Sequence, residues 1–291
     1  MSALATPDRL ADLRRAVAVL EGRLPTGMAP SARGDDPTGD LALPLGLAAL
    51  DGRLGPAGGL AFGALHEIVS DDGRDAAAVA GFASALLVRL LDRRDGRLVW
   101  ISTAEARRES GALHAPGLRL FGLDPGRLVE VTAERPEEAL WAFEEALGCR
   151  GTAAVVAEIP GRPAALDLTA TRRLALRAAP LGTRADGGFG LLLRVGGPAQ
   201  TTAAATRWRV SAAPSRPFDG FSDGLGRPAF RLDLEKNRDG RLGRFDLEWD
   251  PHARRFGALP SHSGRVAAEP SDRPAAAANG RLLAFPGAGR A

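Results

Sequence analysis

Two periods of apolar residues divide the chain into segments of different structure. Continuous apolar runs that are short enough for strands alternate with stretches that have helical spacing. The expected strands are a run ending at 67–68 and the runs 98–101, 128–131, 153–157 and 189–195, and the expected helices are 75–93, 136–147 and 166–178. Strands that are apolar on both faces and alternate with helices predict a parallel sheet covered on both sides.

The pattern changes to strict alternation near the end of this region. Phe230, Leu232 and Leu234 alternate with charged residues, a turn signal follows at 237–240, and apolar residues alternate again over 245–249. Period-two patterning about a turn predicts an antiparallel hairpin with one face in water. We therefore expect an α/β fold, in which a mostly parallel sheet flanked by helices is extended by antiparallel C-terminal edge strands.

Both ends of the chain differ from this central region. Residues 7–23 have apolar positions at helical spacing, which predicts an amphipathic helix. Residues 25–40 and 257–291 are rich in Pro, Gly, Ala and Ser, and they cannot offset their ordering entropy by burial. The predicted organisation is a helix and flexible linker over 1–40, a core domain over 41–256, and a disordered tail over 257–291.

Composition narrows the chemistry. The net charge of +3 and pI near 10.1 overstate the basic character, because Lys236 is the sole lysine and the other basic residues are arginines. Cys149 is the sole cysteine, which excludes an internal disulfide and suits a reducing cytoplasm. The four histidines are scattered without metal-ligand spacing, and no apolar run is long enough to span a membrane. We expect a soluble cytoplasmic protein without a metal or other cofactor.

The first strand leads into a segment where a phosphate-binding loop is expected. In the motif G-x-x-x-x-G-K-[ST], loop amides hold phosphate, the lysine reaches the terminal phosphates and the hydroxyl holds magnesium. Here Ala76 stands at the lysine position and Ala77 at the hydroxyl position, and no shift of register restores a lysine. The aspartates before the helix would cap it and also repel a triphosphate. The candidate residues of this degenerate nucleotide site are Ser70, Gly73, Arg74, Asp75, Ala76, Ala77 and Glu158.

Two acids at strand ends have structural interpretations. Glu158 follows the strand at 153–157, where a RecA-like ATPase carries its magnesium-side acid. Without the lysine and hydroxyl a lone acid cannot assemble a metal and phosphate site, so we favour a turn-capping role. Ser102 and Glu105 have capping-box spacing for the helix that follows the second strand.

These blocks of sequence, in this order, resemble the ImuA family over residues 8–250. The most specific pair is Arg-Trp-Arg-Val at 207–210 with Asn237, Arg238 and Gly240. Members of this family are RecA-like proteins, related to SulA and RecA, that are encoded beside an ImuB polymerase-like protein and an error-prone replicative-type DNA polymerase. The resemblance implies an accessory factor of SOS-induced translesion synthesis, mutagenesis and DNA repair. It acts through contacts with ImuB, with RecA as a further partner.

Two further segments carry partner hypotheses. Arg238, Arg241 and Arg244 on the hairpin are candidates for DNA phosphate contacts, because bidentate donors can follow a nucleic-acid backbone. The alternative, which we favour slightly, is a solvated hairpin whose arginines pair with neighbouring acids. In the tail, Leu282, Leu283 and Phe285 weakly resemble a sliding-clamp peptide, although the usual Gln is absent.

Three functions follow from the sequence. The leading one is a non-catalytic interaction protein of the translesion mutasome, in which the sheet is a scaffold. A second, from the enzyme class, is a divergent DNA-stimulated ATPase that uses Arg74 in place of the lost lysine, next to unfavourable aspartates. A third is a SulA-like inhibitor of cell division, against which the long C-terminal hairpin and tail argue.

Overall fold

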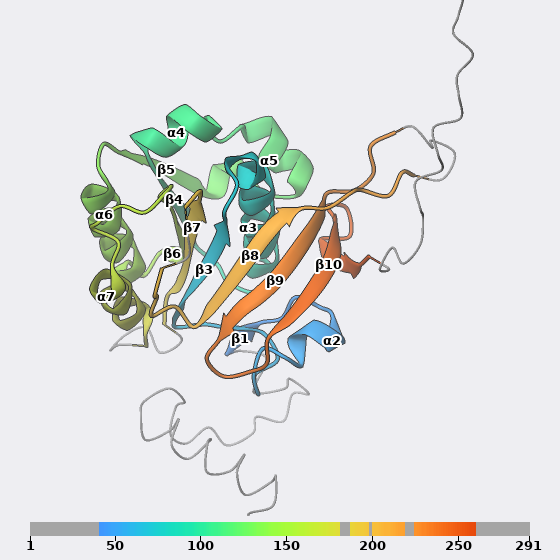
Figure 1. Cartoon of the computed structure of the whole chain (residues 1–291), viewed down its shortest axis with the longest axis horizontal. Helices are drawn as coiled ribbons and strands as arrows, with labels where there is room; N and C mark the ends of the chain where they lie inside the picture. The colour runs from blue at the N-terminus through green and yellow to red at the C-terminus, as the bar shows by residue number, and fades with distance from the viewer. Residues whose placement is uncertain (1–40, 181–186, 198–199, 219–223, 260–291) are drawn as a thin grey trace, which may run out of the picture. The chain divides into compact units, whose positions relative to one another are not determined.

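A nine-stranded sheet organises residues 41–180, 187–197, 200–218 and 224–259, which the computed structural model describes (Figure 1). The strand order is β11-β10-β9-β8-β3-β7-β6-β4-β5. Neighbouring strands from β8 to β5 in this order run parallel. They are β3 (Ala64–Ser70), β4 (Arg97–Thr103), β5 (Leu128–Ala133), β6 (Thr152–Glu158), β7 (Phe189–Val195) and β8 (Thr206–Ala212).

The other end of the sheet is antiparallel. Strand β9 (Ala229–Asn237) pairs with β8 and with β10 (Gly243–Asp250), and β10 pairs with the short edge strand β11 (Arg255–Ala258). The register places Phe230 opposite Leu247, so the apolar positions of the two strands share a face. The predicted antiparallel hairpin is confirmed.

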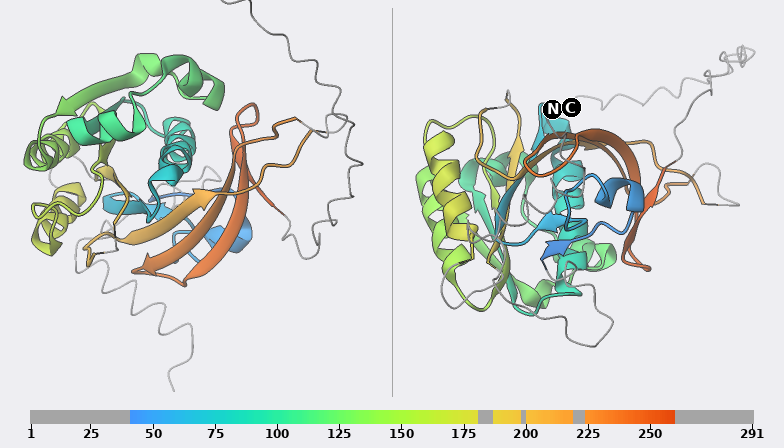
Figure 2. Two further views of the ribbon diagram at one scale, coloured as in Figure 1. Left: turned by 45° about the horizontal axis from the view of Figure 1, so that its top comes forward. Right: turned by 90° about the horizontal axis from the view of Figure 1, so that it is seen from below.

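Helices cover both faces of the parallel part. Figure 2 shows α3 (Ala76–Leu91) on one side of the sheet and α6 (Pro136–Gly148) with α7 (Leu168–Ala178) on the other. Two short helices, α4 (Ala104–Ser110) and α5 (Ala115–Phe121), follow β4, and η2 (Pro125–Arg127) precedes β5. Before β3 in the chain, β1 (Ala42–Leu43) and β2 (Leu60–Ala61) pair in a small separate sheet. The short helix α2 (Ala48–Asp51) belongs to the segment that connects them.

The larger apolar core surrounds α3. The antiparallel strands curve around this helix (Figure 2), which is why its residues are buried on nearly every side. The Phe82 ring centroid lies 6.0 Å from that of Trp208 and 5.7 Å from that of Phe256. Trp208 is fully buried, and Phe256 joins the cluster from β11. The edge strands therefore complete the core as well as the sheet.

Most predicted elements are confirmed, with informative exceptions. The class is α/β with a mostly parallel sheet, flanking helices and antiparallel edge strands, as a RecA-like core requires. The strand predicted at 189–195 has these bounds. The end predicted for the first strand at Ile68 is wrong, because β3 continues to Ser70. Strand β11 was not predicted, since only Phe256 in it is buried, and it extends the core to Ala258, inside the predicted tail.

The predicted cap of α4 is also wrong by one residue. Thr103 is the N-cap, and its Oγ1 accepts a hydrogen bond from the Ala106 amide at 3.2 Å. Ser102 belongs to β4 and is buried, so its hydroxyl is directed to another partner.

Several predictions concern residues outside the described part of the chain. They are the amphipathic helix at 7–23, the linker at 25–40, the tail from 260 onward, and the motif Leu282, Leu283 and Phe285. Within the described residues, none of the helices has the length and apolar character needed to cross a bilayer.

Candidate functional site

The loop between β3 and α3 lies at the carboxyl edge of the parallel strands, where α/β sheets bind their ligands. Ser70 is the last residue of β3, the 3-10 turn η1 covers Gly73–Asp75, and Ala76 begins α3. This confirms that the segment matching the phosphate-binding motif joins a strand to a helix. The motif spacing then puts Asp75 at the position of its second glycine.

Both carboxylate oxygens of Asp75 are hydrogen-bonded within the protein. Oδ2 accepts from the Ser70 hydroxyl at 2.9 Å, and Oδ1 accepts from the Ala212 amide at 3.0 Å. Ser70 is 4% exposed and Ala212 ends β8, so the carboxylate ties the loop to the parallel strand on which the antiparallel extension begins. A negative group of the chain itself therefore lies at the helix start.

The backbone amides of the loop are largely used as well. The Arg74 amide donates to Asp72 Oδ1 at 2.9 Å, the Asp75 amide to the Asp72 carbonyl at 3.1 Å, and the Asp72 amide to Ser70 Oγ at 3.3 Å. A phosphate-binding loop needs such amides free and convergent. Ala76 and Ala77 add only methyl groups. Exposed Arg74 is the sole cationic side chain of the segment 70–77.

Glu158 shares the edge and the face of the sheet with Ser70. It ends β6, which is separated from β3 by β7. Strand alternation places Glu158 on the same face as Val156, which packs in the core around α3. Its Oε2 accepts hydrogen bonds from Ser102 Oγ at 3.0 Å and from Trp100 Nε1 at 3.4 Å. Glu158 is therefore bonded to β4. Its partner Ser102 is the residue that the sequence analysis had assigned as the cap of α4.

Arg209 connects the loop to the antiparallel strands. Its guanidinium forms ion pairs with Asp71 and Glu235, and the Nη2–Glu235 Oε2 distance is 3.2 Å. The hydrogen bond to Glu235 is the main cause of a raised Arg209 pKa, and Asp71 adds to it. Asp71, Asp72 and Asp75 thus outnumber the cations Arg74 and Arg209, which leaves the surroundings of the loop with a net negative charge.

The sequence analysis missed a buried ionic cluster on the face opposite α3. Glu67 is fully buried; its Oε2 lies 2.7 Å from Arg207 Nε, and its Oε1 lies 3.2 Å from Arg194 Nη1. Arg194 also donates to the Gln200 side chain at 2.8 Å. The signal was available, because an acid inside one apolar strand and an arginine inside another cannot stay unpaired. The arrangement joins β7, β3 and β8.

The three hairpin arginines do not form one set. Arg244 Nε lies 2.8 Å from Asp233 Oδ2, which is the cross-strand pairing of the favoured alternative. Arg238 donates to the Ala203 carbonyl at 3.0 Å. For the Arg241 side chain, no hydrogen bond or ion pair is found among the described residues. DNA contact by this set stays a prediction, and Arg244 is its weakest member because its charge is neutralised.

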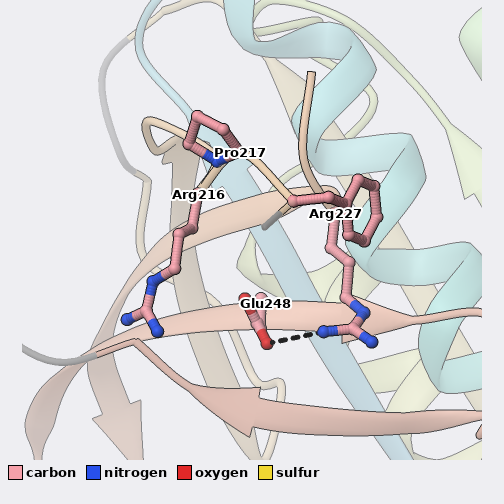
Figure 3. Close-up of a pocket in the computed structure, with 5 residues that line it drawn as sticks. Arg216, Pro217, Arg227 and Glu248 are labelled. Carbon is pink, nitrogen blue, oxygen red and sulfur yellow. Dashed lines mark hydrogen bonds and ion pairs between the residues drawn. The ribbon is translucent and has the colours of Figure 1, made fainter. Parts of the chain in front are cut away.

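A shallow groove of about 190 Å³ lies beside the connection between β8 and β9 (Figure 3). It is lined by Arg216, Pro217, Phe218, Arg227 and Glu248. Arg227 pairs with Glu248 at 3.4 Å and lies 5.7 Å from the centre of the Phe218 ring. The groove holds no nucleophile with an adjacent base, so it carries no catalytic hypothesis.

No group of three or more His, Cys, Asp or Glu residues in the described ranges is arranged to hold a metal ion. Cys149 is exposed at the end of α6. The described residues therefore offer no donor set on which metal chemistry could be argued.

The comparisons with known proteins assign the family. No model of a protein family matches the chain. Two curated relatives, both called Protein ImuA, come from strains NA1000 / CB15N and ATCC 19089 / CB 15 of Caulobacter vibrioides. Each is 38% identical to this chain over 248 residues, which covers 81% of this chain and 93% of the relative. Such identity over most of both proteins shows that the chain belongs to the ImuA family.

Proposed function

We propose that the protein is a non-catalytic accessory factor of damage-induced, error-prone translesion synthesis. Its RecA-like core is a scaffold, and its surfaces recruit an ImuB-type polymerase-like protein in the cytoplasm. Membership of the ImuA family supports the place in the damage-response mutasome. RecA, the error-prone polymerase and the sliding clamp are further partners of this proposal.

One observation carries the non-catalytic part. The Asp75 carboxylate bonds Ser70 and Ala212 at the start of α3, so the space and the donors that phosphate would use are engaged within the protein. Neither Ala76 nor Ala77 can contact phosphate or magnesium as the motif requires. Glu158 is bonded to Ser102 and lacks the groups with which it would share a metal.

The rival ATPase function needs Arg74 to replace the lysine. Arg74 belongs to a 3-10 turn and stands between Asp72 and Asp75. A planar guanidinium at that position would have to bring a triphosphate against both acids, and it cannot reproduce the point charge of a lysine that follows the second glycine. The geometry favours the scaffold.

Calorimetric titration tests this conclusion. ATP and ADP with magnesium are titrated into the full chain, with and without single-stranded DNA, and RecA serves as the positive control. We expect no saturable heat. The matched variant is Arg74→Ala. If the wild type bound nucleotide saturably and this variant did not, the scaffold hypothesis would be overturned and the ATPase hypothesis supported.

The partner half of the proposal has its own test. A purified ImuB-type protein is immobilised, and the full chain is passed over it at physiological salt. We expect retention that does not change when nucleotide is added. If the full chain is not retained at all, recruitment of ImuB is wrong.

A further inference from the structure

The turn of the β9–β10 hairpin is held against the segment that follows α2. The Arg241 amide donates to the Arg53 carbonyl at 2.9 Å, and Asn237 Nδ2 donates to the same carbonyl at 2.8 Å. In return, Arg53 Nη1 donates to the Leu242 carbonyl at 2.9 Å. A Cβ added to Gly240 would lie 1.9 Å from the Arg53 oxygen, so the two backbones are in close contact. This turn is preorganised.

Four cations at or next to this turn form no ion pair with a carboxylate among the described residues. Arg53 and Arg238 donate to main-chain carbonyls, and so does Lys236, whose Nζ reaches the Thr202 carbonyl. Carbonyl groups orient the cations without cancelling their charge. The pKa of Lys236 is lowered, mainly by burial and further by the positive charges of Arg238 and Arg207, although the buried carboxylate of Glu67 opposes this shift. We define the turn cluster as these four cations together with the neighbouring leucine, namely Arg53, Lys236, Arg238, Arg241 and Leu242.

Arg244 shows the contrast. It lies only a few residues beyond the turn, but its guanidinium pairs with Asp233. Across the same face of the hairpin, Arg231 pairs with Asp246, and Arg227 pairs with Glu248. Within residues 236–243 the single acid is Asp239. The positive charge of the turn cluster therefore remains available to a partner, whereas that of the neighbouring strands does not.

Leu242 decides which kind of anion fits. Leu242 is 54% exposed and directly follows Arg241 in the turn. Residues 237–243 contain no aromatic side chain, and the neighbouring Phe245 packs against the core, so the exposed apolar group of the turn is a leucine rather than a ring on which a base could stack. An apolar residue flanked by arginines instead matches a peptide in which an apolar residue is flanked by acids.

We propose that the turn cluster docks an acidic, leucine-containing peptide segment of a protein partner. This rests on the proposed function, because it names the surface through which the scaffold recruits. The arginines supply charge-assisted hydrogen bonds to carboxylates, and Leu242 contributes apolar contact area next to Arg241.

The lone lysine makes the surface directly observable. Reductive methylation with ¹³C-formaldehyde labels Lys236 and the N-terminal amine of the full chain, and the Lys236 methyl signal reports the pKa of that amine by NMR. The probe is a synthetic peptide of alternating glutamate and leucine, with a lysine–leucine peptide of the same length as its control. Bound carboxylates raise the pKa of a neighbouring amine, so we expect the acidic peptide to raise that of Lys236 and the control peptide to leave it unchanged.

Affinity is measured in parallel by fluorescence anisotropy of the labelled acidic peptide. We expect Arg241→Ala to weaken binding several-fold, and Arg53→Ala with Arg238→Ala and Arg241→Ala together to weaken it at least about tenfold. Arg244→Ala is the matched control and leaves the affinity within about twofold. Because the Arg241 side chain makes no hydrogen bond or ion pair within the described part of the chain, its single variant should keep the fold even if the triple variant does not.

Three results would overturn the proposal. One is an unchanged Lys236 signal with saturating acidic peptide, and another is equal affinity of the Arg241→Ala and wild-type proteins. The third is a single-stranded oligonucleotide that binds through the turn cluster when the peptide does not, which would make the surface a nucleic-acid contact. Retention on ImuB despite any of these results would leave the scaffold function standing, whereas loss of ImuB binding by the wild type would remove that function itself.

Discussion

Arg207 Nε lies 2.7 Å from the carboxylate of Glu67, which is fully buried on the face of the sheet opposite α3. Arg194 approaches the other oxygen of the same carboxylate from the opposite neighbouring strand. One acid thus holds two arginines and, through them, the strands β7 and β8 on either side of β3. Buried charges are tolerated only in such pairs, because each isolated charge would cost several kcal/mol.

Replacing Glu67 with Gln should therefore destabilise the protein strongly. The change leaves two buried guanidinium groups without a counter-charge, and we expect the free energy of unfolding to fall by about 3–5 kcal/mol in urea denaturation. Arg231→Ala, which breaks an exposed pair with Asp246, is the control and should cost no more than about 1 kcal/mol. Equal effects of the two substitutions would show that the buried cluster is not a structural element.

His66 should make stability depend on pH. It is fully buried; its Nε2 donates to the Ala61 carbonyl, and its Nδ1 accepts from Thr206 Oγ1, each at 2.9 Å. Burial lowers its pKa from 6.5 to about 4, although the bond to Ala61 opposes this shift. Below pH 6.5 the unfolded chain binds a proton at this histidine, whereas the folded protein binds it only near pH 4. The free energy of unfolding therefore falls as the pH is lowered from 6.5 to about 4.

The loss over this window is about 3 kcal/mol, at about 1.4 kcal/mol for each pH unit. Carboxylates also titrate at the acid end, so the useful quantity is the difference between wild type and His66→Gln in urea unfolding at several pH values. The variant should lose less stability on acidification. His252→Asn, at an exposed position, should follow the wild type, and a His66→Gln curve parallel to the wild type would contradict the assignment.

Removing the Asp75 carboxylate should weaken the fold without creating a nucleotide site. Asp75→Ala leaves the buried Ser70 hydroxyl without this acceptor, and it also leaves the Ala212 amide unpaired. We expect a loss of about 1–3 kcal/mol in unfolding free energy. Calorimetry should still detect no ATP binding, because Ala76 and Ala77 remain. ATP binding by this variant would mean that the carboxylate alone had excluded the nucleotide.

Two glycines should respond oppositely to alanine. Gly240→Ala forces a methyl group against the Arg53 carbonyl, so the hairpin turn must move, at a cost of about 1–3 kcal/mol. Gly73→Ala meets no atom within 4 Å, and reduced freedom of the unfolded chain should make it neutral or slightly stabilising. Thermal unfolding of both variants tests this. A neutral Gly240→Ala would show that the turn is loosely held, which would also weaken the case for a preorganised turn cluster.

The order and type of the main elements were predictable from local pattern. Residues 189–195 are apolar except for Arg194 and form a central strand buried on both faces, whereas Phe230, Leu232 and Leu234 alternate because their strand has one wet face. The loss of the motif lysine at Ala76 is equally local. Such features depend on a few adjacent residues, and periodicity reports them directly.

Long-range pairing was decided only by the tertiary structure. Sequence alone does not show that Asp75 accepts a hydrogen bond from the Ala212 amide. Nor does it show that Ser102 donates to Glu158 instead of capping α4, or that Glu67 has two arginines as partners. The candidate site was located by sequence, but the bonds that fill it come from β4 and β8. Apolar alternation sets which face a residue takes, whereas the register between strands far apart in the chain sets which polar groups meet there.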